Sequence, residues 1–157
     1  MEIRRAQNGD INGILELLVQ VNMVHHVGRP DLFKGPTTKY SEEELKELIL
    51  DDKKPIFVGI EDGKVLGHAF CVFQEHKGER LLEDCKTLYI DDICVHENSR
   101  GSHVGKRLYE FVEDFAKREG CHNITLNVWE CNPGAKAFYE AMGMGVQKTG
   151  MEKILGN

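Results

Sequence analysis

The sequence lacks a long hydrophobic run, both at its start and further along. A membrane-spanning helix needs about 20 consecutive apolar residues, and a secretory leader needs an apolar stretch behind a basic start. Residues 1–5 instead mix charged and apolar side chains and lead directly into strand-like and helical sequence. We therefore predict a cytoplasmic protein that has no membrane as a partner.

Cysteine is scarce and is not spaced in pairs. There are five cysteines, an odd number, whereas disulfide frameworks use even sets and zinc sites repeat a short Cys or His spacing. Neither pattern occurs in this sequence. We therefore expect free thiols and no metal site.

Positive charge is also in the minority. Lys and Arg together number 20 against 26 Asp and Glu, a formal net charge of -6. Because nucleic-acid-binding surfaces are basic, we do not expect DNA or RNA as a partner. A cationic small molecule suits this charge better, although the same charge also serves simply to keep a protein in solution.

No linker, internal repeat or low-complexity stretch divides the 157 residues, of which 41% are hydrophobic. A chain of this length can build one sizeable core. We therefore predict a single domain that spans residues 1–157.

Hydrophobic periodicity predicts a mixed α/β fold. The predicted strands are residues 2–6, 56–60, 65–73, 86–95 and 124–129, with one or two short strands within 145–155. The predicted helices follow Asp10, Ser41, His103 and Asn132, and residues 25–40 are expected to form a loop. Residues 86–129 form a strand–helix–strand unit, which is expected to be a right-handed crossover between parallel strands. The start of its helix should therefore lie at the edge of the sheet where ligands bind.

The turn before this helix predicts a phosphate-binding site. It contains Arg100, Gly101, Ser102, His103, Val104 and Gly105. Small residues before a helix let backbone N–H groups approach an anion, and the positive end of the helix dipole favours negative charge. A nucleoside triphosphate loop needs four residues between its first glycine and Gly-Lys, followed by Ser or Thr. Here only three residues separate Gly101 from Gly105, and Arg107 follows Lys106. A dinucleotide motif is absent as well.

The remaining pattern resembles the GNAT superfamily of acetyl-CoA-dependent N-acetyltransferases. Residues 100–105 match its pyrophosphate loop, Arg/Gln-x-x-Gly-x-Gly/Ala, except that His103 stands at the usual central glycine. Residues 132–144 resemble its Asn-x-x-Ala-x-x-Phe-Tyr-x-x-x-Gly-Phe motif, with Met144 at the last position. The two motifs follow in the family's order. The resemblance implies a GNAT (acyl-CoA N-acyltransferase) fold, a mixed central sheet flanked by about four helices.

The resemblance also implies an activity and a binding site. The expected reaction moves the acetyl group of acetyl-CoA to a primary amine by direct attack, without a covalent enzyme intermediate. In the family, the strand before the loop offers backbone N–H groups to pantetheine and the thioester oxygen. The residues expected to bind the cofactor are Ile93, Cys94, Val95, Arg100, Gly101, Ser102, His103, Val104, Gly105, Lys106, Asn132 and Lys136.

Three side chains are candidates for acid–base chemistry. In similar enzymes the tyrosine at the position of Tyr139 protonates the CoA sulfur, and the ordinary pKa of about 10 keeps a tyrosine protonated at neutral pH. The alternative is that Tyr139 only packs with Phe138. Asp91 and Asp92 interrupt an apolar strand, and alternation predicts that they point to opposite faces. One carboxylate should face the amine, and by resemblance we favour Asp91; the alternative is that both pair with lysines.

Other functions remain open at this stage. The departure at His103 is also compatible with a catalytically silent CoA-binding sensor or interaction module, and a protein or peptide N-acetyltransferase is a further alternative. The expected partner is a small-molecule or peptide amine, and a homodimer is left open. The loop at 24–40 carries His25, Phe33 and Tyr40, which could form part of an acceptor wall.

Overall fold

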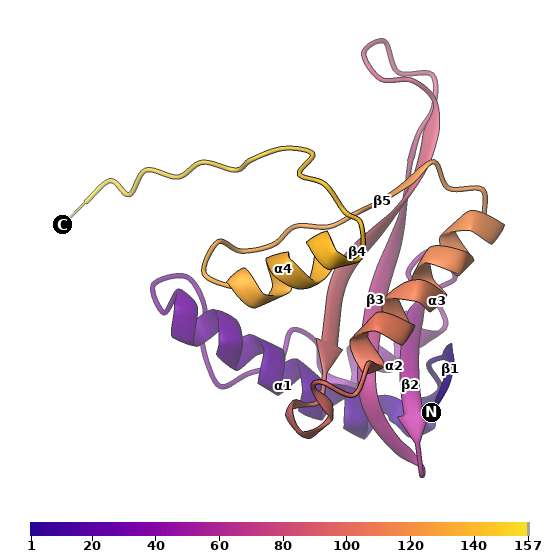
Figure 1. The fold of residues 1–157 in the computed structure, drawn as a ribbon, viewed down its shortest axis with the longest axis vertical. Helices are drawn as coiled ribbons and strands as arrows, with labels where there is room; N and C mark the ends of the chain where they lie inside the picture. The colour runs from indigo at the N-terminus through magenta and orange to yellow at the C-terminus, as the bar shows by residue number, and fades with distance from the viewer. Residues whose placement is uncertain (157) are drawn as a thin grey trace.

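The computed structural model describes residues 1–156 of the chain. The helices and strands in chain order are β1 (Glu2–Arg5), α1 (Ile11–Gly28), α2 (Glu42–Ile49), β2 (Ile56–Glu61), β3 (Lys64–His76), β4 (Cys85–Val95), α3 (Val104–Arg118), β5 (Asn123–Thr125) and α4 (Pro133–Ala141). Single 3-10 turns lie before α1, at Asn8–Asp10, and after β4, at Glu97–Ser99. Figure 1 shows the strands at the centre and the chain after α4 running away from them.

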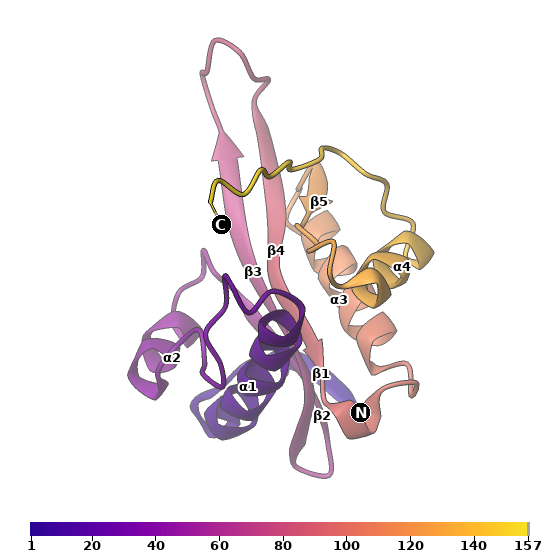
Figure 2. The same cartoon turned by 90° about the vertical axis from the view of Figure 1, so that its left-hand side faces the viewer.

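The strands form one sheet in the order β1-β2-β3-β4-β5. Neighbours are antiparallel except β4 and β5, which are parallel because α3 connects them as a crossover. Figure 2 shows α1 and α2 on one face of the sheet and α3 and α4 on the other. This arrangement confirms the predicted mixed α/β fold of the GNAT type.

Alternation along the strands divides the core between the two faces. Phe70 of β3 lies in a cluster with residues of α1 and α2, including the fully buried Ile14 and Leu45. Its neighbour Cys71 lies in the opposite cluster with Leu88 of β4 and Val112 of α3. Each face therefore supplies its own apolar layer, and burial of these layers is the main favourable term in folding.

The turn and cap residues behave as the sequence indicates. Asp62 and Gly63 have φ angles of 50° and 73°, as a two-residue hairpin turn requires. Ser41 and Glu44 make a reciprocal capping box at the start of α2. The side chain of Asn132 accepts a hydrogen bond from the Ala135 N–H at 3.2 Å and so caps α4.

Three predicted boundaries were wrong. Helix α1 continues to Gly28 instead of ending near His25, because its last turn packs against Cys131: a Cβ on Gly28 would lie 2.7 Å from the Cys131 Sγ. Strand β5 ends at Thr125 instead of Trp129. Residues 145–155 contain no strand.

Candidate active site

The second half of β4 has a strand on one side only. The parallel pairing with β5 spans Thr87 to Tyr89, whereas the antiparallel pairing with β3 continues to Val95. From Ile90 onward, the β4 main chain therefore faces no strand on the side of β5 (Figure 2). A strand edge of this kind presents unpaired N–H and C=O groups that another extended molecule can bind.

The early end of β5 creates this opening. Beyond Thr125, Leu126 packs against the α3-side cluster. The Trp129 ring meets Phe33 of the α1–α2 loop edge-on at 5.1 Å between centroids. These two contacts draw the chain away from β4. Alternation of apolar residues could not reveal this, because it describes the faces of a strand and not its neighbours.

A β-bulge changes the directions of the two predicted carboxylates. Phe70 of β3 pairs with Asp92 and Cys71 pairs with Ile90, so Asp91 is an extra residue in β4. Asp91 binds Lys39 and Asp92 binds His68. Both partners lie on the α1 side of the sheet, which corrects the prediction that the carboxylates point to opposite faces. An extra residue in a strand locally breaks the two-residue alternation.

The partners of the Phe70 ring fix this orientation. His68 meets Phe70 edge-on at 4.9 Å, and Tyr40, which follows Lys39 in the chain, stacks on Phe70 at 5.7 Å. Both carboxylates therefore have partners that lie around one ring on one face.

Asp92 is held by a fully buried histidine. The His68 Nε2 lies 2.6 Å from the Asp92 Oδ2, and His68 is 0% exposed. The His68 Nδ1 is buried without a hydrogen-bond partner. A proton on that nitrogen would leave a buried donor unsatisfied, which costs about 1–3 kcal/mol. The geometry therefore favours a neutral ring that donates from Nε2 to an ionised Asp92.

Asp91 has a different environment. Its Oδ2 lies 2.5 Å from the Lys39 Nζ, and the Lys39 side chain is 53% exposed. The lysine neutralises Asp91 near the surface. Asp92 is paired instead with a neutral ring, so it keeps its full negative charge next to the open half of β4.

The phosphate-type turn follows β4 directly and uses two left-handed residues. Gly101 has a φ of 82° and His103 has a φ of 62°. His103 therefore adopts the backbone conformation that glycine adopts most readily, which explains why glycine suits this position. Helix α3 begins at Val104, and its first backbone bond runs from the Arg107 N–H to the His103 carbonyl. The N–H groups of Val104, Gly105 and Lys106 thus have no partner within the helix.

The side chains predicted to bind the cofactor do not all face this turn. Cys94 is buried on the α1 side, with its Sγ 3.5 Å from the Leu17 carbonyl, so only its main chain faces the open edge. Burial raises the pKa of its thiol to about 12. Lys106 lies 3.7 Å from Glu110, and the Asn132 side chain is engaged in capping α4. The other side chains in this set that carry charge, Arg100 and Lys136, are exposed.

Tyr139 reaches the same region from the opposite face. It packs on the α3-side cluster, with its ring 5.1 Å from Phe138 and 6.4 Å from Tyr109. Burial is the main cause that raises the pKa of its phenol, and the charge of Asp92 is the second. The open half of β4 therefore lies between a protonated phenol on one face and a carboxylate on the other.

Two partners of the acidic residues were not predicted, His68 and Lys39. His68 stands inside the apolar run of β3, and a polar residue in such a run was the signal that could have found it. Lys39 lies in a loop without periodicity, so the sequence contained no comparable signal. Across residues 1–156, no group of three or more His, Cys, Asp or Glu could hold a metal ion. Among the helices of the same residues, none is long and apolar enough to cross a membrane.

Comparison with known proteins identifies the family. Residues 21–144 match the model of the Acetyltransferase (GNAT) family, and the chain therefore belongs to the GNAT acetyltransferases. A mutant of the BH1408 protein from Bacillus halodurans has the same fold, with a TM-score of 0.94, 28% identity and coverage of 99% of both chains. The crystal structure of glucosamine-6-phosphate N-acetyltransferase from Arabidopsis thaliana has a TM-score of 0.72 and 26% identity, and the match covers 99% of this chain and 98% of that one.

Curated relatives include enzymes with different acceptors. The Arabidopsis thaliana glucosamine 6-phosphate N-acetyltransferase sequence is 30% identical over 55% of this chain and 64% of its own length. The thialysine N-epsilon-acetyltransferase of Bos taurus is 27% identical over 90% of this chain and 82% of its own length. The chain thus spans slightly less than two thirds of the Arabidopsis relative, and 60% of a probable glucosamine 6-phosphate N-acetyltransferase from Drosophila melanogaster.

Proposed function

We propose that this protein transfers the acetyl group of acetyl-CoA to a primary amine by direct attack of the amine on the thioester. The observation that carries the proposal is the open half of β4, which leads without interruption into the turn before α3. An extended main-chain edge followed by free helix N–H groups suits a ligand with an amide-containing arm and a pyrophosphate.

The main chain would make most of the contacts with acetyl-CoA. The N–H groups of Val104, Gly105 and Lys106 would bind the pyrophosphate, and the edge at Ile93 to Val95 would bind the pantetheine arm. A fixed N–H group on this edge would also stabilise negative charge that develops on the thioester oxygen. Arg100 and Lys136, both exposed, would add positive charge near the phosphates.

Asp92 would act on the amine, a role for which the sequence had favoured Asp91. An amine must lose a proton before or during attack, and a carboxylate can accept that proton directly or through a water molecule. Asp92 keeps its charge because its partner, His68, is a neutral donor. Asp91 is neutralised by Lys39, and would instead set the charge of the acceptor entrance.

Tyr139 would protonate the departing CoA thiolate. Burial raises the pKa of its phenol, so the proton is present throughout the neutral range. As the new amide bond forms, the carbon–sulfur bond breaks, its electron pair stays on sulfur, and the phenolic proton completes the thiol. The proton removed from the amine would in turn restore the phenol through solvent.

The test measures CoA release from acetyl-CoA with a panel of amines. The panel contains glucosamine 6-phosphate and thialysine, which are named for the relatives, together with polyamines, aminoglycosides and peptides. We expect turnover with at least one primary amine and a loss of about 100-fold in Tyr139→Phe. Tyr109→Phe removes a hydroxyl from the adjacent ring and is the matched control. Binding of CoA without turnover on any amine would overturn the proposal and indicate a silent CoA-binding module.

A further inference from the structure

The chain after α4 leaves the body of the protein. All residues from 145 to 156 are exposed, and within this described part of the chain none makes a backbone hydrogen bond. Figures 1 and 2 show this segment crossing the region beyond the end of α1 and finishing away from the sheet. The Arg29 guanidinium lies 3.0 Å from the Glu152 carboxylate and holds the segment on this course.

This C-terminal segment, residues 146–155, is rich in exposed apolar side chains. Val146, Met151, Ile154 and Leu155 are 72%, 90%, 71% and 86% exposed. Single exposed apolar residues are ordinary on a protein surface, but a group of them on one segment marks an interaction site. The segment therefore needs a surface that covers it.

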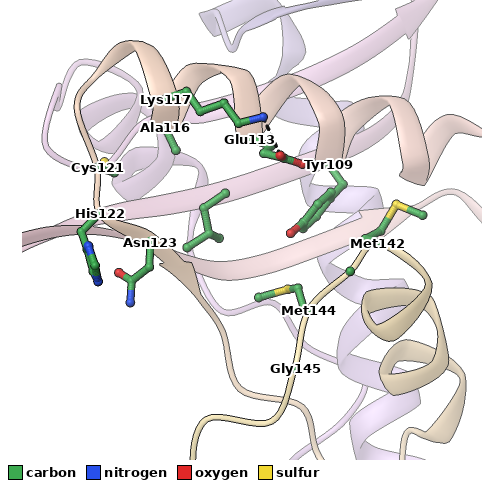
Figure 3. A pocket seen from close by; sticks show the side chains of 12 residues that line it. Tyr109, Glu113, Ala116, Lys117, Cys121, His122, Asn123, Met142, Met144 and Gly145 are labelled. Atoms are coloured by element: carbon green, nitrogen blue, oxygen red, sulfur yellow. Dashed lines mark ion pairs between the residues drawn. The ribbon is translucent and has the colours of Figure 1, made fainter.

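A matching position exists at the edge of the sheet. β5 is the last strand in the order, so its outer edge carries no further strand. Beside it lies an open hollow of about 400 Å³ whose apolar lining includes Tyr109, Ile124, Met142 and Met144. Figure 3 shows this hollow between α3, β5 and the chain that leaves α4.

We propose that the C-terminal segment of one copy adds to the outer edge of β5 in a second copy, and that the second copy does the same in return. The segment's own course leads away from its own β5, and Arg29 fixes that course. Each chain supplies one free segment and one free edge, so two copies satisfy both. Such reciprocal exchange gives a closed dimer with two-fold symmetry, and main-chain pairing with a sheet edge supplies part of its affinity.

The first measurement is the mass of the full chain by light scattering during gel filtration. We expect about twice the chain mass of 17.8 kDa. A monomer at micromolar concentration would overturn the proposal. This test needs no substrate, so its result is independent of the proposed acetyl transfer.

The second measurement replaces two exposed side chains, Ile154→Asp together with Leu155→Asp. We expect the dissociation constant of the dimer to rise about 100-fold or more, because each change places a charge where an apolar side chain is buried. The matched control is Leu81→Asp, since Leu81 is 91% exposed and lies between β3 and β4. The control should remain dimeric.

Hydrogen exchange identifies the surface that is used. In the native dimer, we expect the amides of residues 123–127 to be protected, and in the double variant we expect them to exchange at least tenfold faster. A dimer that survives the double substitution with unchanged protection would contradict the proposed exchange. Protected amides in a monomer would also contradict it, since the segment would then pair with its own β5.

Discussion

The two halves of β4 differ in how many neighbours they have, and this difference separates stability from chemistry. Residues Thr87 to Tyr89 pair on both sides, and Leu88 at their centre is 0% exposed. Residues from Asp91 onward pair with β3 alone and carry two partly exposed carboxylates. Full pairing builds the core, whereas loss of one neighbour leaves main-chain donors and charged side chains free to meet a ligand.

Removing a core side chain from the paired half gives the largest expected effect. Leu88→Ala should lower the free energy of unfolding by about 2–5 kcal/mol, because the site lies between packed layers and cannot collapse around the cavity. Urea denaturation measures the change. Leu81→Ala, at the 91% exposed Leu81, should change stability by less than about 0.5 kcal/mol. Equal losses in the two variants would contradict the structural role given to the paired half.

The open half should respond in activity instead. Asp92→Asn keeps the shape of the side chain but cannot accept a proton, and we expect kcat/KM to fall about 100-fold, or about 2.7 kcal/mol. Asp91→Asn, the control in the adjacent position, should lose less than about fivefold, because Lys39 already neutralises Asp91. Steady-state rates with an acceptor from the amine panel decide between them. A larger loss in Asp91→Asn would restore the assignment that the sequence favoured.

The carboxylates also show how far the sequence could lead. Two acidic residues in an apolar strand could be recognised from the sequence, as could the turn before α3 and the tyrosine of α4. Their directions could not, since the bulge at Asp91 arises from pairing with β3, and a single strand carries no record of its register. The end of β5 depends likewise on the contact between Trp129 and Phe33, which lie far apart in the chain.

The phenol across the open half should be visible in the pH dependence of stability. Burial raises the pKa of Tyr139 above the ordinary value of 10.0, so the unfolded chain loses this proton at a lower pH than the folded chain. The associated stability is present below pH 10 and is lost as the pH rises through the folded pKa. At pH 11, the loss should reach up to about 1 kcal/mol. Urea titrations between pH 9 and 11 should show a smaller loss in Tyr139→Phe; parallel curves for the two proteins would exclude this environment for the phenol.

The smallest expected effect concerns the turn that follows the open half. His103 has a φ of 62°, a conformation that costs roughly 1 kcal/mol for a residue with a side chain. His103→Gly removes this cost but increases the entropy of the unfolded chain by a similar amount. We therefore expect the free energy of unfolding to change by less than about 0.5 kcal/mol.

Gly101 provides the opposite substitution for the same measurement. Its φ is 82°, and a Cβ there would meet no atom within 4 Å, so any effect of Gly101→Ala comes from the backbone alone. This variant should lose about 1 kcal/mol. Calorimetry with CoA completes the comparison, because the free N–H groups of α3 remain in both variants and the dissociation constant should change less than about threefold for His103→Gly. A gain of tenfold or more would mean that the histidine side chain, and not the backbone, limits how closely the phosphates approach the turn.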